Sequence, residues 1–178
     1  RSMIKYRGEI MLSPHYNHWV STNESRRWAS CEDMHGKIYA LSERADPSPP
    51  LHPHCRWQIR RMEARPAGTA TGDGRRGADW YLKRYGTLPE YYLCESAAKR
   101  LGWVQKRGNL SSVAPGKMFG GEIYHNRNDH LPSAPGRIWY EADINYRGGF
   151  RGTDRILFSS DGLIFVTYDH YRSFIEIL

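Results

Sequence analysis

Four side chains in the C-terminal part of the chain have types that could together cleave a phosphodiester. Glu141 and His170 could serve as general base and general acid, because a carboxylate and an imidazole both exchange protons readily. Arg151 and Arg155 could hold a phosphate through paired N–H donors. This set suits RNA cleavage by the RNA's own 2′-hydroxyl, for which the protein supplies neither nucleophile nor metal. From the residues alone, an ordinary ion-pair network on a sheet face is the alternative.

These groups meet only if short strands position them. Alternation along a strand places Trp139, Glu141 and Asp143 on one side, and consecutive strands tend to pair. The β-branched and aromatic runs between turns predict five strands. They are Met118–Tyr124, Ile138–Ile144, Arg155–Ser159, Leu163–Tyr168 and Ser173–Ile177.

Helical patterns precede these strands. Ala78–Tyr85 predicts a helix that stops at Gly86, and Ala97–Leu101 predicts a second one capped by Ser96. The turn Ser160-Asp161-Gly162 predicts a hairpin. Helices followed by an antiparallel meander predict an α+β fold, with the helices packed on a twisted antiparallel sheet.

Composition excludes several classes of protein. The chain has 178 residues, 26 Lys+Arg against 19 Asp+Glu and a net charge of +7, which favours phosphate-bearing partners but also fits a merely soluble basic face. We expect no membrane protein, because apolar stretches fall far short of the ~20 residues that span a bilayer, and residues 1–11 show no signal-peptide pattern. Three cysteines imply no complete disulfide framework.

A change of composition divides the chain. The run 65–77 is rich in Gly, contains Pro and lacks any large apolar residue, so it predicts a flexible linker with nothing to bury. We therefore expect a small irregular N-terminal module at 1–64 and a C-terminal domain at 78–178.

From about Ala78 onward the chain resembles the barnase-like family of microbial guanyl-preferring ribonucleases. The matching stretches include Leu101-Gly102-Trp103-Val104, Val113-Ala114-Pro115-Gly116-Lys117, Gly120-Gly121-Glu122-Ile123, Glu141-Ala142-Asp143-Ile144-Asn145-Tyr146, Asp154-Arg155-Ile156-Leu157 and Asp169-His170-Tyr171. Their order and spacing hold over about 100 residues with hardly a gap, which chance does not produce. The resemblance implies an RNA endonuclease without cofactor or catalytic metal.

The resemblance also assigns roles to residues. Glu141 matches the family's general base and His170 its general acid, and Arg151 and Arg155 match the arginines that bind the scissile phosphate. The expected product is a 2′,3′-cyclic phosphate. Asp143 matches a residue that holds both arginines, and a further match is a structural ion pair between Arg137 and Asp161.

Base recognition matches less completely. Asn126 and Arg127 match the family's guanine-binding loop, and Tyr171 matches a residue that lines the substrate groove. Asn128 stands where the family usually has a Glu that accepts from guanine, so guanine preference is expected to relax. Alternatively, Asn128 is simply a turn residue.

A second departure lies at Glu95, where the family usually has a Lys aimed at the phosphate. Lys99 or another cation could compensate, the enzyme could be weak, or the site could be altered to protect the host. A carboxylate also suits a helix N-terminus on dipole grounds alone.

The N-terminal module resembles the C-terminal end of phage Mu F-type minor head proteins. The matching residues are Glu24–Cys31, His35–Tyr39 and Pro49–Trp57. The family pattern pairs each cysteine with a second one, and here Trp28 and Trp57 stand at those positions. Each cysteine thus stands alone, and Cys31 and Cys55 could be thiols, a disulfide or metal ligands. We favour a packed hairpin-like appendage without metal.

The two resemblances in this order predict a polymorphic toxin. We expect a secreted or phage-delivered ribonuclease that acts in the bacterial cytoplasm and is neutralised by an acidic immunity protein. The alternatives are a catalytically weakened RNA-binding module, which Glu95 would favour, and a structural protein of the phage head.

Overall fold

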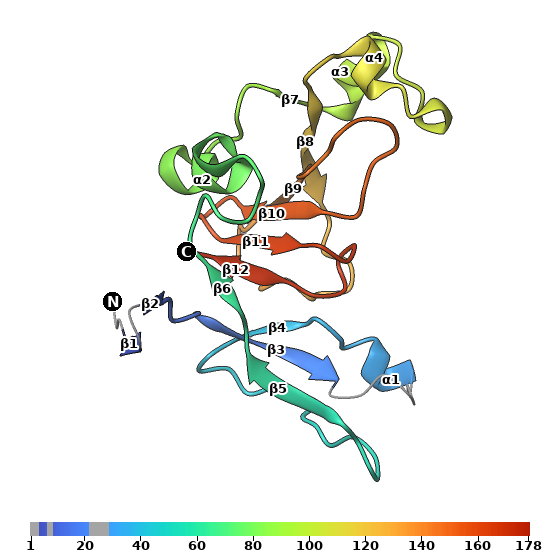
Figure 1. Cartoon of the computed structure of the whole chain (residues 1–178). Helices are drawn as coiled ribbons and strands as arrows, with labels where there is room; N and C mark the ends of the chain where they lie inside the picture. Colours follow the sequence, from blue (N-terminus) through green and yellow to red (C-terminus); the bar gives the residue numbers. More distant parts are fainter. Residues whose placement is uncertain (1–3, 7–8, 22–28) are drawn as a thin grey trace.

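A computed structural model of the chain describes residues 4–6, 9–21 and 29–178. In this part, a small N-terminal sheet module is followed by short helices and then by a mostly antiparallel sheet (Figure 1). The fold is α+β, which confirms the expected class. Among the described residues, no helix combines the length and the apolar character that crossing a membrane requires.

The main sheet has seven strands in the order β6-β12-β11-β10-β9-β8-β7 (Figure 1). The bounds of its central strands are Met118–Tyr124 for β8, Trp139–Asp143 for β9, Arg155–Ser159 for β10, Ile164–Thr167 for β11 and Ile175–Ile177 for β12. They pair antiparallel in chain order, which confirms the predicted meander with slightly shorter strands.

Two very short strands complete the sheet at its edges. Ala64–Arg65 forms β6 and pairs in parallel with β12, while Tyr92–Leu93 forms β7 and pairs in parallel with β8. Sequence periodicity does not detect strands of two residues, because one alternation is no pattern.

The first two helices of the C-terminal domain lie close to their predicted positions. Helix α2 spans Ala78–Tyr85 and ends at Gly86, whose left-handed φ of 73° a glycine adopts at little cost. Helix α3 spans Glu95–Arg100. The prediction that Ser96 caps it is wrong: Cys94 is the N-cap residue, and Ser96 lies inside the first turn.

Three shorter helical segments after residue 65 were not predicted. They are the 3₁₀ helices η1 (Gly74–Arg76) and η2 (Gln105–Arg107) and the single-turn helix α4 (Leu110–Val113). Each is too short to show an amphipathic repeat in the sequence.

The two faces of the main sheet pack against different partners. Ala142, Ile156 and Val166 lie on one face and form a core with Leu82 of α2. Trp139, Leu157 and Phe165 belong to the core of the opposite face. Because side chains alternate along each strand, Glu141 and Asp143 share the second face with Trp139.

The run 65–77 is packed onto the sheet and is not a spacer with nothing to bury. Ala70 is 4% exposed and belongs to the same core as α2. The buried carboxylate of Asp79 accepts hydrogen bonds from the Gly68 and Ala70 N–H groups at 2.7 and 2.9 Å. A buried carboxylate needs such donors, and this need orders the glycine-rich backbone. The division at 1–64, 65–77 and 78–178 stays a prediction.

The N-terminal module is a three-stranded sheet of order β4-β3-β5 and not the expected hairpin-like appendage. Its strands are β3 (Tyr16–Ser21), β4 (Ile38–Ala40) and β5 (Trp57–Arg61), with the one-turn helix α1 (Ala29–Glu32) beside them. The strands β1 (Ile4–Tyr6) and β2 (Glu9–Met11) form a separate pair. Trp28 lies outside the described residues.

A large buried cluster gives this module its own core. It contains Trp19, Cys31, Tyr39 and Trp57, of which Trp19 and Cys31 are fully buried. Trp57, which stands at one of the positions where the head-protein pattern has a cysteine, is therefore part of the packing.

Burial of His18 predicts how the stability of this module depends on pH. Burial, with His35 and Arg60 nearby, lowers the pKa of His18 from its ordinary 6.5 to about 4. Between these values the unfolded chain binds a proton that the folded chain does not, so stability falls as the pH drops from about 6.5 towards 4. We expect thermal unfolding at pH 7 and pH 5 to show this loss, and His18→Gln to reduce it. An equal loss in both proteins would contradict the assignment.

Candidate active site

The register of β8, β9 and β10 brings the predicted catalytic groups onto one face. Asp143 lies opposite Arg155 on β10, and Glu141 lies opposite Glu122 on β8. A bulge on β8 near Gly121 separates the Glu122–Glu141 pairing from the pairing of Gly120 with Ala142. The sheet thus places Glu141 between a second carboxylate and the arginine pair.

Asp143 holds both arginines. Its side chain is 2% exposed and accepts hydrogen bonds from Arg151 Nε at 2.9 Å and Arg151 Nη2 at 2.6 Å. Arg155 Nε lies 3.1 Å from Asp143 Oδ1, within ion-pair distance. These hydrogen bonds outweigh the effect of burial and raise the pKa of Arg151. The Arg151 guanidinium therefore stays charged, and Asp143 fixes both guanidiniums beside Glu141.

The two arginines differ in exposure. Arg155 is 5% exposed, and its Nη1 donates to the carbonyls of Gly152 and Asp154 at 2.8 and 2.9 Å. The Arg151 side chain is 34% exposed, and its guanidinium lies over the Phe119 ring. Of the two, Arg151 is the more accessible to a ligand.

Tyr171 is hydrogen-bonded to the predicted base. Its hydroxyl donates to Glu141 Oε2 in a short contact, and its ring stacks on Tyr124 at 5.3 Å. Burial and the Glu141 carboxylate together raise the pKa of Tyr171, so the hydroxyl keeps its proton. Tyr171, expected only to line the groove, therefore also positions Glu141.

The loop after β11 is held by Asp169. Its Oδ1 accepts from Thr167 Oγ1 at 2.9 Å and from Ser173 N at 2.9 Å, and its Oδ2 accepts from Ser173 Oγ at 2.6 Å. Burial opposes ionisation, but these donors prevail and lower the pKa of Asp169. The loop holds His170 and Tyr171 at φ values of 56° and 69°, in the left-handed region that such residues seldom occupy.

The structure links His170 to the cluster only through its neighbour. Its side chain is exposed, and its ring centroid lies 4.9 Å from that of Tyr171, which contacts Glu141. The cavity that contains Glu141 and Arg151 is not lined by His170. The imidazole is thus free to meet a substrate from the solvent side.

A cavity of about 230 Å³ lies beside Glu141 and carries three carboxylates. Its lining includes Glu95, Glu122, Glu141 and Arg151. Glu122 Oε1 accepts from the Glu95 N–H at 2.7 Å, at the first residue of α3. Glu122 was missed from the sequence, because alternation from Gly120, which pairs with Ala142, would place it on the opposite face, and the bulge near Gly121 brings it to the site.

Lys99 pairs with the unusual Glu95. Their charged atoms lie 2.8 Å apart, one helical turn from each other, with side chains 61% and 41% exposed. This contact agrees with the expectation that Lys99 compensates the carboxylate, and because the pair is exposed, water and salt screen it.

The predicted base-recognition residues form a tight loop. Asn126 Oδ1 accepts from the Leu131 N–H at 3.0 Å, and Asn126 Nδ2 donates to the Leu131 carbonyl at 2.9 Å. These two hydrogen bonds close the loop. Asn128 Oδ1 accepts from the His130 N–H at 3.2 Å, as a turn residue does. Arg127 is exposed. The Asn126 amide is therefore occupied within its own loop, whereas the exposed Asn128 and Arg127, together with the backbone, are the groups left to meet a base.

The N-terminal module contacts both loops of the site. His130 Nε2 donates to the Asp33 carbonyl at 2.6 Å, and the Ile38 N–H donates to the His130 carbonyl at 2.8 Å. Arg172, two residues after His170, pairs with Glu32 at 3.0 Å. These contacts join residues far apart in the chain, which no sequence pattern predicts.

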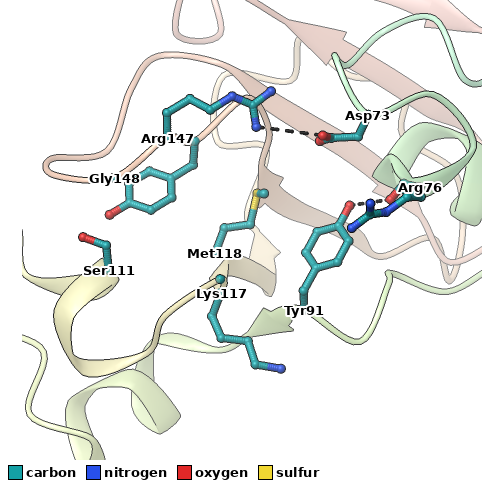
Figure 2. Close-up of a pocket in the computed structure, with 10 residues that line it drawn as sticks. Asp73, Arg76, Tyr91, Ser111, Lys117, Met118, Arg147 and Gly148 are labelled. Atoms are coloured by element: carbon teal, nitrogen blue, oxygen red, sulfur yellow. Dashed lines mark hydrogen bonds and ion pairs between the residues drawn. The ribbon is translucent and has the colours of Figure 1, made fainter.

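A second cavity, with a basic lining, lies away from Glu141. Figure 2 shows its lining, in which Arg147 reaches towards Asp73 at 3.9 Å and the Tyr91 hydroxyl donates to the Arg76 carbonyl. Its volume is about 320 Å³, and Lys117 also lines it. Its lining has three cations and no histidine, and its carboxylate, Asp73, lies within ion-pair distance of Arg147.

Comparison with known proteins assigns the class. A family model described as ribonuclease matches residues 75–178. The chain belongs to the barnase family of microbial ribonucleases and is a ribonuclease. The match begins at residue 75, so the resemblance of the N-terminal segment to phage head proteins stays a prediction.

Individual relatives agree with this class. The chain is 56% identical over 97 residues to a ribonuclease of Heyndrickxia coagulans, a span that covers 54% of this chain and 89% of that protein. The same identity over 97 residues relates it to ribonucleases of Bacillus intermedius and Bacillus pumilus, of which the match spans 60%.

The buried position of Asp143 predicts a large effect on stability. Asp143→Asn leaves two guanidiniums without their counter-charge, and we expect the free energy of unfolding to fall by about 3–5 kcal/mol. Urea denaturation measures this loss. Asp161→Asn is the matched control. The Asp161 side chain, which pairs with Arg137, is 49% exposed, so losing this ion pair should reduce the free energy of unfolding less. Equal losses in the two variants would contradict the assignment.

Proposed function

We propose that this chain is an RNA endonuclease that cleaves 3′ to guanosine by transphosphorylation. The observation that carries the proposal is the common face on which Glu141 lies between Tyr171 and the arginines held by Asp143. A phosphate bound by Arg151 and Arg155 would place its ribose 2′-hydroxyl beside Glu141.

The reaction follows from these positions. Glu141 takes the proton from the 2′-oxygen, which attacks phosphorus, and the bond to the 5′-oxygen breaks. His170 gives its proton to that oxygen, which leaves a 2′,3′-cyclic phosphate. Water then opens the ring with the two roles exchanged. Tyr171 engages Glu141 Oε2, so Oε1 receives the proton.

The arginines supply charge stabilisation. Charge builds on the equatorial oxygens of phosphorus, and fixed donors act most strongly when they need no reorganisation. Asp143 and the carbonyls of Gly152 and Asp154 fix Arg155 in advance. The chemistry requires no metal ion, which a chelator tests.

A short RNA with a single guanosine tests the mechanism. In the presence of chelator, we expect cleavage 3′ to the guanosine with a cyclic phosphate end. Glu141→Gln and His170→Ala should each lower kcat about 10²–10⁴-fold. Glu90→Gln, which neutralises an exposed carboxylate outside the cavity lining, is the control and should leave the rate unchanged. Full activity in either catalytic variant would contradict the roles. RNA binding without cleavage by the native chain would favour a binding module.

Replacing the negative charge of Glu95 by a positive one should raise the ribonuclease activity. Glu95→Lys replaces a carboxylate in the cavity by a cation, and we expect kcat/KM to rise at least about tenfold, equivalent to about 1.4 kcal/mol. The gain should shrink at high salt. Glu90→Lys makes the same charge change outside the cavity lining and should give a much smaller gain. Equal gains would show a general charge effect and refute a local role.

We propose further that the ribonuclease is an antibacterial toxin, delivered by secretion or on a phage, with RNA of the bacterial cytoplasm as its target. The order of the head-protein-like segment and the ribonuclease domain supports this role. The exposed Arg151 offers an acidic immunity protein a cationic anchor in the active site. Expression in bacteria should arrest growth with the native chain and not with Glu141→Gln at equal protein level.

A further inference from the structure

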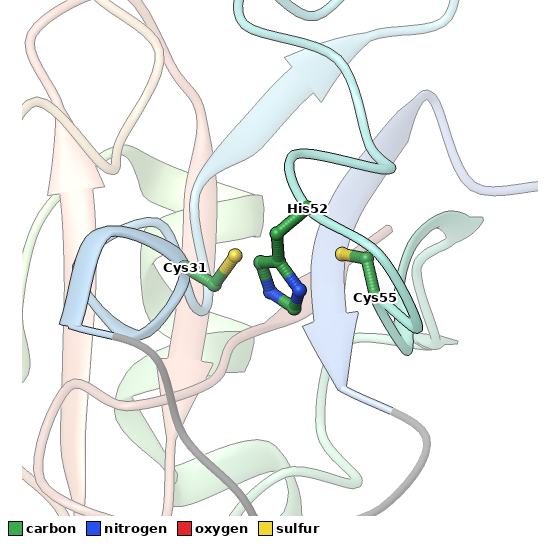
Figure 3. A group of neighbouring side chains, drawn as sticks. All are labelled: Cys31, His52 and Cys55. Carbon is green, nitrogen blue, oxygen red and sulfur yellow. The ribbon is translucent and has the colours of Figure 1, made fainter.

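The N-terminal module brings two cysteines and a histidine together. The side chains are Cys31, His52 and Cys55, and their ligand atoms all lie within 4.8 Å of one another. Figure 3 shows the His52 ring between the two cysteine side chains. We propose that these three residues bind a zinc ion, with the fourth coordination position open to water.

The ligand types and spacing fit zinc. Zinc takes cysteine sulfur at ~2.3 Å and histidine nitrogen at ~2.0–2.1 Å in a tetrahedron, which places its ligand atoms about 3.6–3.8 Å apart. Side chains that already lie within 4.8 Å of one another reach that spacing by small rotations. Cys31 is buried, whereas His52 and Cys55 are partly exposed, so water can enter from their side.

The hydrogen bonding of His52 prepares its ring for a metal. Its Nδ1 lies 3.0 Å from the Pro53 carbonyl oxygen, which can only accept. Nδ1 therefore carries the proton and Nε2 the lone pair. Metal-binding histidines commonly donate their second ring N–H to a carbonyl or carboxylate in this way, which fixes tautomer and orientation.

The backbone holds His52 and Cys55 on one side of a turn. The Cys55 N–H donates to the His52 carbonyl at 3.1 Å, which closes the turn between them. Although burial opposes it, backbone donors and Cys31 lower the pKa of Cys55, while burial raises that of Cys31. Zinc binds cysteine as the thiolate, so zinc binding would release the thiol protons.

A zinc ion at this site would connect the N-terminal module to the two loops of the active site. Zinc would join α1, which carries Cys31, to the turn before β5. The residues that follow Cys31 are Glu32 and Asp33, which contact Arg172 and His130 in the two loops of the active site. A bound ion would thereby fix the contacts that support both loops.

Metal uptake by the full chain tests the proposal. The reduced, chelator-treated protein is titrated with zinc chloride and examined by native mass spectrometry, and with cobalt(II), whose thiolate charge-transfer absorption reports sulfur ligands. We expect one ion per chain, the thiolate band, and a higher unfolding temperature with zinc. Cys55→Ser and His52→Ala should each lose tight binding, while Cys94→Ser, which changes a cysteine at α3, should keep it.

The outcomes separate the alternatives. Because cobalt absorption is read on the native chain, a variant that fails to fold does not decide the result. No uptake by the reduced chain would overturn the proposal. So would a Cys31–Cys55 disulfide in the purified protein combined with failure to bind zinc after reduction. Loss of binding in Cys94→Ser would place the ion elsewhere and also refute it.

Discussion

The carboxylate of Asp143, buried at the end of β9, is the constraint on which the site depends. Two guanidiniums cannot stay close together in a protein interior without a counter-charge, and Asp143 supplies it to Arg151 and Arg155. Its position follows from strand alternation, which also fixes Glu141 two residues earlier on the same face. The sheet therefore places the proposed base and the proposed phosphate-binding arginines on one face, and Tyr171 connects them to the loop that carries the proposed acid, His170.

The N-terminal module is part of this arrangement and not merely an attachment. Strand β6 extends the main sheet at the edge of β12 (Figure 1). Glu32 and Asp33 contact the loops that carry His170 and Asn126. The proposed zinc ion lies one residue from these contacts. Metal binding and ribonuclease activity would thus be coupled through α1, although neither requires the other chemically.

The sequence predicts the structure correctly where neighbouring residues along the chain determine it. Alternation and turn chemistry predicted the five central strands, and family resemblance predicted the pairing of Asp143 with the arginines. It failed where distant segments decide the structure. The glycine-rich run 65–77 is ordered by Asp79. Cys31 lies far from His52 and Cys55 along the chain, and only the fold brings it to them.

We propose that Arg151 and Arg155 bind the phosphate, and two-dimensional NMR of the arginine Nε–H groups tests this claim most directly. Guanosine 3′-monophosphate would be added stepwise to the isotope-labelled native chain. We expect saturable chemical-shift changes at Arg151 and Arg155. The signals of Arg76 and Arg147, which line the second cavity, should stay unchanged. Shifts at Arg76 and Arg147 with none at Arg151 and Arg155 would contradict it.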